Sequence, residues 1–200
     1  MLKRIRVILA VLFIAGITLL FAGIGSQWWG WMAKLQFLQS CMALNFAVII
    51  GVILLTVLFG RIYCSVICPM GVFQDFVIWL RKKFGPKKKF KFNKEHKWVR
   101  YPVLVLTAAA IFAGLQVVVA LIAPYSAYGR MVHTAVGAGT GDSLSPALII
   151  TALVTFIAIV LCSWLWGRAY CNTVCPVGTF LGLFSKHSLF HVRIDEDKCV

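Results

Sequence analysis

Uncharged, mostly apolar stretches alternate with basic ones along this chain. Four stretches contain no charged residue: 7–33, 35–60, 101–129 and 143–167. A helix needs about 20 mainly apolar residues to cross the hydrocarbon core of a bilayer, and each stretch is long enough. We place the membrane spans at residues 5–24, 42–61, 100–123 and 145–167. The pattern therefore predicts an all-α integral membrane protein with four transmembrane helices.

The positive charges fall on one side of these four spans. Of the 20 lysines and arginines, 18 precede the first span, lie between the second and third, or follow the fourth. Lys34 and Arg130 are the other two. Basic loops stay on the cytoplasmic side of a membrane. We therefore expect a multi-pass protein of the inner (cytoplasmic) membrane with both termini in the cytoplasm.

Composition and net charge narrow the class of partner. Hydrophobic residues make up 61% of the chain, far more than in an average soluble domain. The net charge of +14 invites a nucleic-acid interpretation. Basic residues beside membrane spans, however, fix the topology and contact anionic lipid headgroups. We therefore expect membrane lipid as a partner and no nucleic acid.

The chain contains an internal repeat. Residues 60–73 match residues 167–180 at a constant offset of 107, with Gly, Arg, Tyr, Cys, Cys, Pro, Gly and Phe identical. Each matching segment follows the second span of a pair, which predicts a parallel two-plus-two repeat. The first repeat is expected at residues 1–81 and the second at residues 99–190. A basic cytoplasmic loop, 82–98, would join them, and a tail, 191–200, would follow.

Short helices at the membrane interface are expected after both matching segments. Pro69 and Pro176 suit the first position of a helix, where no backbone N–H is needed. The apolar face of the first such helix would consist of Phe73, Phe76, Val77 and Leu80. On the opposite side of the membrane, the segment 124–146 is rich in glycine near Gly137–Gly141, and we expect an irregular backbone there.

Paired cysteines carry the chemistry of the repeat. The pattern Cys-x3-Cys-Pro occurs twice, with its thiols at Cys64, Cys68, Cys171 and Cys175. Thiolates are soft ligands, and four of them suffice for one [4Fe–4S] centre. The same fragment ends the bacterial ferredoxin pattern. The pattern predicts an iron–sulfur centre used for electron transfer.

Two arginines support this interpretation. Arg61 and Arg168 each stand three residues before the first cysteine of their motif. A cluster bound by four thiolates is anionic, so nearby guanidinium groups would stabilise it. The glycine that follows each proline would let the backbone approach closely, and helix N-terminal amides could then donate to sulfur.

Other uses of these cysteines stay open at this point. Structural disulfides are disfavoured because the cytoplasm keeps thiols reduced. Four thiolates also form structural zinc sites and bind Cu(I). The alternatives are therefore a metal-handling or oxidase-assembly protein that binds copper through the same cysteines, and a thiol–quinone oxidoreductase. Cys41 and Cys162 lie in or beside spans and are expected to be structural.

The paired motifs Cys64-x3-Cys68-Pro69 and Cys171-x3-Cys175-Pro176 resemble those of the membrane-bound polyferredoxin family. That family includes NapH-type quinol dehydrogenases and the membrane part of NosR-type proteins. The resemblance implies a 4Fe-4S cluster and an electron-transfer subunit that links quinol oxidation to a redox partner protein. It also implies a ferredoxin module after the last span. Cys199 looks like the first ligand of such a module and would serve as one only in a longer parent.

A quinol site would need an apolar slot and a group that accepts a proton. The sequence offers two candidates. The first lies in the outer segment and consists of Tyr125, Tyr128, Arg130 and His133. The second lies beside Cys68 and consists of Phe73, Gln74 and Asp75, where a surface ion pair is the simpler role for the carboxylate. Haem is not expected, because the spans contain no histidine.

Overall fold

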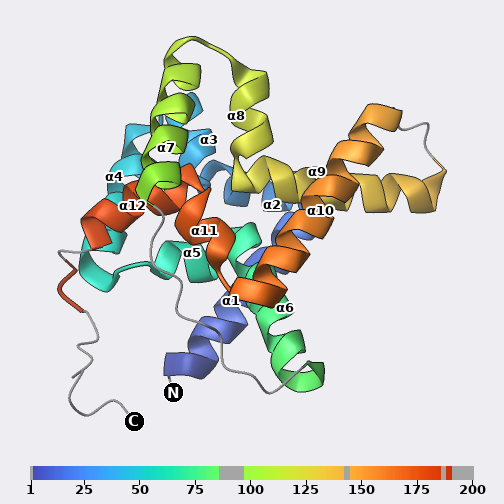
Figure 1. Cartoon of the computed structure of the whole chain (residues 1–200), viewed down its shortest axis with the longest axis horizontal. Coiled ribbons are helices and arrows are strands. Elements are labelled where there is room, and N and C mark those ends of the chain that lie inside the picture. Colours follow the sequence, from blue (N-terminus) through green and yellow to red (C-terminus); the bar gives the residue numbers. More distant parts are fainter. Residues whose placement is uncertain (1, 86–96, 142–144, 186–187, 191–200) are drawn as a thin grey trace.

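The computed structural model describes residues 2–85, 97–141, 145–185 and 188–190, and within these ranges all regular secondary structure is helical. The first half of the chain forms α1 (Leu2–Phe21), α2 (Ser26–Lys34), α3 (Phe37–Met42), α4 (Phe46–Phe59), α5 (Ile62–Val66) and α6 (Pro69–Phe84). The second half forms α7 (Lys97–Phe112), α8 (Gln116–Ile122), α9 (Pro124–Thr140), α10 (Pro146–Trp166), α11 (Ala169–Thr173) and α12 (Pro176–Ser185). The all-α prediction is therefore confirmed for the described residues (Figure 1).

Two helices in the described residues are long and apolar enough to cross a membrane, over Arg4–Phe21 and Pro146–Trp166. They correspond to the first and fourth expected spans. The other two expected helices are not continuous. Residues 42–61 are interrupted at Leu44, whose φ of 51° is left-handed, before α4 begins at Phe46. Residues 100–123 are divided into α7 and α8 by Gly114, whose φ of 71° a glycine adopts without strain.

The expectation of an irregular backbone near Gly137–Gly141 is wrong, because α9 continues to Thr140 and Gly141 is its C-cap. Pro124 opens this helix at a position where no N–H is required. Gly129 is needed for packing: a side-chain carbon there would overlap the ring of Phe21 on α1. Glycine lowers intrinsic helix propensity, but here it permits a close contact between helices.

The expected interfacial helix after the first motif exists as α6, but its buried face differs from the prediction. Met70, Gln74 and Val77 are buried, whereas Phe76 is 55% exposed. The reason is tertiary, since α6 packs against α5, α10, α1 and α9 rather than lying free at a surface. Its counterpart α12 is shorter.

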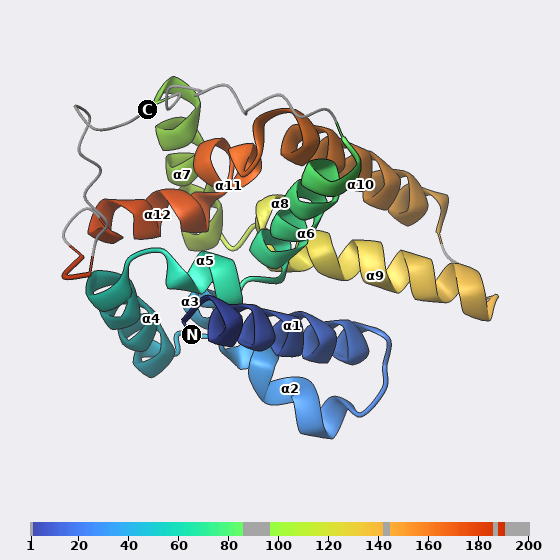
Figure 2. The same ribbon diagram turned by 90° about the horizontal axis from the view of Figure 1, so that it is seen from below.

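The two halves of the chain are interleaved around the cysteine segments. The helix after the first motif, α6, packs against α10 of the second half, and α12 packs against α4 of the first half. Short helices α5 and α11 lie between these pairs (Figures 1 and 2). The core that surrounds them includes Ile17, Met70 and Leu181, which are fully buried. The fold therefore brings both motifs to the centre of the molecule.

Residues 188–190 fasten the second half to the first. The backbone N–H groups of Leu189 and Phe190 donate to the carbonyl oxygens of Val57 and Leu58, at 3.0 and 3.1 Å. Phe190 also stacks on Phe59, with ring centroids 5.6 Å apart. These bonds satisfy two of the carbonyls that a helix end otherwise leaves without a partner.

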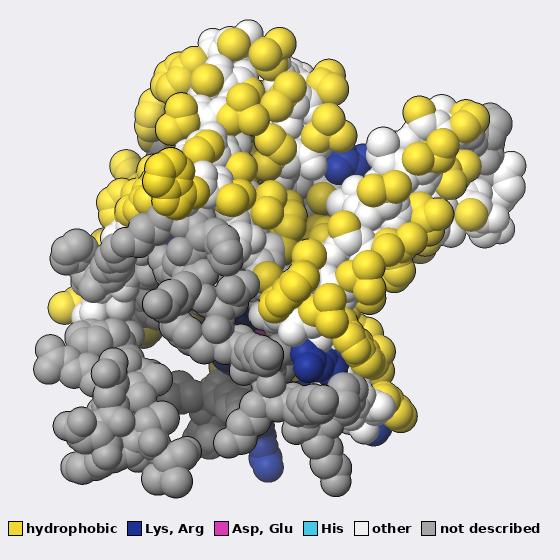
Figure 3. Space-filling model, in the orientation of Figure 1, with side chains coloured by type: hydrophobic (Ala, Val, Ile, Leu, Met, Phe, Trp, Pro, Cys, Tyr) yellow, Lys and Arg dark blue, Asp and Glu magenta, His cyan; other side chains and the backbone are white. Residues whose placement is uncertain are grey.

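The outer faces of several helices are strongly apolar. Figure 3 shows hydrophobic side chains over the exposed faces of α7, α8 and α10. On α10, Ile150, Leu153 and Val154 are each more than half exposed. Contiguous apolar surface of this kind marks contact with a membrane or another protein.

Candidate metal centre

The two cysteine motifs have the same backbone. Helices α4 and α10 both end at a glycine, Gly60 and Gly167, with a left-handed φ of 73° in each. A single helical turn follows and carries the first cysteine. The N–H of the second cysteine then donates to the carbonyl oxygen of the motif tyrosine at 3.0 Å in both copies. The sequence repeat is thus also a structural repeat.

One glycine in each motif, Gly71 in the first and Gly178 in the second, holds the motif in its folded shape. A side-chain carbon at Gly71 would overlap the carbonyl oxygen of Cys64, and one at Gly178 would overlap that of Cys171. The first turn of α6 or α12 therefore lies directly against the first cysteine of its own motif. The sequence predicts such a close backbone approach, and the glycine Cα atoms approach a carbonyl oxygen while the Gly178 N–H also approaches the Cys175 sulfur.

The four motif cysteines are buried and lie within electrostatic reach of one another. Their exposed fractions are between 3% and 7%. Burial raises the pKa of every one of the four thiols, and it raises that of Cys68 to about 12. Cys68 and Cys64 of the first motif further raise the pKa of Cys171 and of Cys175. A metal that replaces the protons would remove this penalty, because coordination deprotonates a thiol.

Positive groups surround the same thiols. Arg61 and Arg168 both lower the pKa of Cys64, against the larger effect of burial. Arg168 also lowers the pKa of Cys68 and Cys171. The two predicted arginines therefore lie where they can offset negative charge on the cysteines.

Backbone amides at the starts of α6 and α12 also lower the pKa of motif cysteines. The N–H groups of Gly71 and Met70 lower the pKa of Cys68. Gly178 and Val177 do the same for Cys175, with the nitrogen of Gly178 3.5 Å from the sulfur. These amides are the free N–H groups of α6 and α12, which are suited to negatively charged atoms.

Each motif arginine forms a hydrogen bond with a residue from the other half of the chain. Arg168 donates from both Nε and Nη2 to the carboxylate of Asp75 on α6, with an Nε–Oδ1 distance of 2.6 Å. Arg6 approaches the same carboxylate at 3.5 Å. Arg61 donates instead to Asn172 Oδ1 at 2.8 Å. Asp75 thus has the expected ion-pair role, and its pairing with Arg168 links the two halves at the site.

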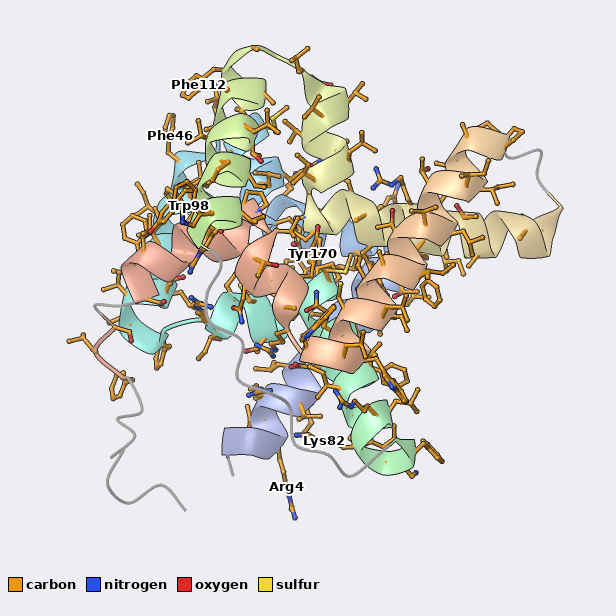
Figure 4. The ribbon with its side chains drawn as sticks, viewed as in Figure 1. Arg4, Phe46, Lys82, Trp98, Phe112 and Tyr170 are labelled. Atoms are coloured by element: carbon orange, nitrogen blue, oxygen red, sulfur yellow. The ribbon has the colours of Figure 1, made fainter. Side chains whose placement is uncertain are left out.

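Two tyrosines belong to the site although the sequence interpretation did not single them out. Burial raises the pKa of Tyr63 and Tyr170, and nearby motif cysteines raise both further. The hydroxyl of Tyr63 accepts from the N–H of Phe37 at 2.8 Å and donates to Gln36. That of Tyr170 donates to the carbonyl of Ile122 at 3.1 Å (Figure 4). Their identity in the repeat was the signal that could have identified them.

The outer quinol-site candidates Tyr125, Tyr128, Arg130 and His133 all lie on α9. Tyr125 packs against Phe21, with ring centroids 5.0 Å apart. Arg130 donates to the carbonyls at the end of α8, and His133 is exposed. No hydrogen bond joins these three side chains within the part of the chain that the structure describes. Cys199 lies outside the described residues.

The donor set fits a cluster with several irons. Among the described residues, no three His, Cys, Asp or Glu side chains are close enough to hold one metal ion. A [4Fe–4S] centre binds each thiolate through a different iron, so its four ligands need not meet at one ion. Four buried thiols with amide and guanidinium groups beside them are the ligands and the environment that such a centre requires.

Comparison with known proteins agrees with this assignment of chemistry. A family model described as a 4Fe-4S binding domain matches residues 42–87 and 148–195, which contain the two motifs. No solved structure matches the chain.

Several curated proteins are similar over most of the chain. The methylamine utilization ferredoxin-type protein MauN of Paracoccus denitrificans is 32% identical over 160 residues, which cover 78% of this chain and 50% of that protein. The ferredoxin-type protein NapH of Escherichia coli is 28% identical over 154 residues, covering 74% of this chain and 48% of NapH. NapH of Haemophilus influenzae is 29% identical over 149 residues, with coverages of 74% and 47%. The chain thus spans about half the length of the curated relatives it matches, and these similarities support a NapH-type polyferredoxin family.

Proposed function

We propose that this chain is a membrane electron-transfer protein that holds one [4Fe–4S] centre with two cysteines from each motif. Cys64, Cys68, Cys171 and Cys175 would be the ligands. The observation that carries the proposal is that these four thiols, drawn from both halves, are buried and influence one another's ionisation. When bound, such a centre accepts and releases single electrons.

The surrounding residues have separate tasks. Arg61, Arg168 and the amides of Gly71 and Gly178 offset the negative charge of the thiolates. Asp75 holds Arg168 in place with two hydrogen bonds. The buried Tyr63 and the half-buried Tyr170 exclude water and fix the motif backbone to its neighbours.

We also propose that the protein lies in the inner membrane, exchanges electrons with the quinol pool and passes them to a redox partner protein. Four uncharged stretches and the apolar surfaces of α1 and α10 support the membrane location. Arg4 and Lys82 lie at one end of the molecule and Phe112 at the other (Figure 4), as expected if the basic end is cytoplasmic. The two-plus-two topology with both termini in the cytoplasm is part of this proposal.

Metal and sulfide analysis of anaerobically purified protein tests the main proposal. We expect about four irons and four acid-labile sulfides per chain. Cys64→Ser and Cys171→Ser should each lower both contents sharply. Cys162→Ser, which removes a half-buried cysteine outside the motifs, should leave them unchanged. Zinc or copper in place of iron would contradict the proposal, and copper would favour the metal-handling alternative.

A further inference from the structure

A cavity lies between α3 and α8, and Ser126 of α9 also lines it. Its volume is about 420 Å³, within the range of small-molecule sites. The buried floor consists of Leu38, Val119 and Ala123. Gln39 of α3 and Gln116 of α8 are exposed side chains in its lining. The cavity is therefore an apolar slot with an amide group on each of its two helices.

Both walls of this cavity are hydrogen-bonded to tyrosines of the cysteine motifs. Tyr63 accepts from the first residue of α3, Phe37, which directly precedes the lining residue Leu38. Tyr170 donates to the last residue of α8, Ile122, which directly precedes the lining residue Ala123. The sequence repeat thus places one tyrosine between each cysteine pair and one wall of the cavity.

The two glutamine amides have unused hydrogen-bonding capacity. Within the part of the chain that the structure describes, neither Gln39 nor Gln116 forms a side-chain hydrogen bond. An amide can donate to a carbonyl oxygen and can equally accept from a hydroxyl. Two such groups on opposite helices suit a flat apolar ring that carries an oxygen at each end. That ligand class is the quinones and their quinols.

We propose that the cavity between α3 and α8 binds the head group of a quinone or quinol, with Gln39 and Gln116 as hydrogen-bonding partners. This inference rests on the proposed quinol linkage and locates its site. It differs from the outer candidate of Tyr125, Arg130 and His133, in which the Tyr125 ring packs against Phe21 and Arg130 donates to carbonyls of α8. The exposed apolar faces of α7 and α8 would guide an isoprenoid tail toward lipid.

Binding of menadione, a naphthoquinone, to purified protein in detergent tests the site without requiring electron transfer. Ala120→Phe fills the cavity from α8 and should weaken binding at least about ten-fold. Gln39→Leu and Gln116→Leu should each weaken it about five-fold, since each removes one hydrogen bond. Gln27→Leu changes an exposed glutamine of α2 outside the cavity and is the matched control. Unchanged affinity in all three cavity variants would overturn the proposal.

Two further arms separate the site from simpler explanations. 2-Methylnaphthalene has the same ring system without the oxygens, and it should bind at least about ten-fold more weakly than menadione; equal binding would contradict a role for the amides. A photoreactive azidonaphthoquinone should label peptides of α3 and α8, and labelling confined to α1 or α10, which contribute no residue to the lining, would contradict the location.

The cluster and the quinone site can fail independently. A Cys64→Ser/Cys171→Ser double variant lacks the proposed cluster ligands but retains every residue of the cavity. It should bind menadione with an affinity within about two-fold of that of the unmodified chain. Binding in a chain that never contains iron would support the cavity and refute the iron–sulfur proposal. Absence of binding in a protein with its full iron content would refute the quinone site in the cavity and support the iron–sulfur proposal.

Discussion

The first cysteine motif and the second share the residues that shape the backbone, but they differ on the helix that follows. Positions 60–64 and 167–171 have the same left-handed glycine and the same helical turn. At the offset of 107, Gln74 corresponds to Leu181, and Asp75 corresponds to Gly182. Both Gln74 and Leu181 are fully buried. The two halves thus share the backbone geometry of the motif but differ in the polarity of the helix that follows it.

Among the described residues, only one of the two motif arginines therefore pairs with a carboxylate. Arg168 of the second motif meets a carboxylate at Asp75. Arg61 of the first motif reaches the corresponding position of the other half, where a side-chain carbon on Gly182 would lie 2.9 Å from its Nη2. Its partners in the described residues are Asn172 and Ser185 rather than an acid. The comparison indicates that both halves keep the glycines, cysteines and proline of the motif, whereas the charges around it differ between the halves.

The largest expected effect is at the duplicated glycines. Gly71→Ala and Gly178→Ala should each destabilise the fold by about 3 kcal/mol and lower iron content, because the new methyl group overlaps a backbone oxygen that cannot move freely. Thermal unfolding and iron analysis measure both. Gly51→Ala in α4, with nothing within 4 Å, is the control and should be neutral or slightly stabilising. A tolerated Gly178→Ala beside a disruptive Gly71→Ala would break the equivalence of the motifs.

A smaller effect is expected at the charged contact present in only one half. Asp75→Asn should destabilise the protein by about 2 kcal/mol, since it removes a carboxylate that is 30% exposed from two charge-assisted hydrogen bonds. Asn172→Ala, which removes the partner of Arg61, should cost about 0.5 kcal/mol. Chemical denaturation of both variants gives the ranking. Equal losses would show that the carboxylate adds nothing beyond a neutral acceptor.

The smallest effect concerns the buried amide. Neither polar atom of Gln74 has a hydrogen-bond partner among the residues that the structure describes, and the other half has leucine at this position. Gln74→Leu should therefore stabilise the chain by about 1 kcal/mol, measured by thermal unfolding. The reverse change, Leu181→Gln, should destabilise it. A loss of stability in Gln74→Leu would mean that the amide serves a group bound beside α6.

Local sequence patterns predict some parts of this molecule and not others. The first and fourth expected spans are the helices α1 and α10, because their uninterrupted apolar runs suffice to define them. The repeat predicts that the motifs fold alike. The breaks at Leu44 and Gly114, and the helix at Pro124–Thr140, depend on contacts with distant residues such as Phe21. No local pattern contains that information.

The same division holds within the site. Cysteine spacing identifies Cys64, Cys68, Cys171 and Cys175, and the repeat points to Arg61 and Arg168. The pairing of Arg168 with Asp75 joins residues 93 positions apart, and the bond from Tyr170 to Ile122 spans 48. These residues come into contact only when the two halves of the chain pack against each other.

Low-temperature EPR of the dithionite-reduced protein tests the central claim most directly. The unmodified chain should give a single iron–sulfur signal, and Cys68→Ser and Cys175→Ser should each abolish or alter that same signal, since the two residues would serve one centre. Two distinguishable signals, each lost in only one of these variants, would contradict a shared centre.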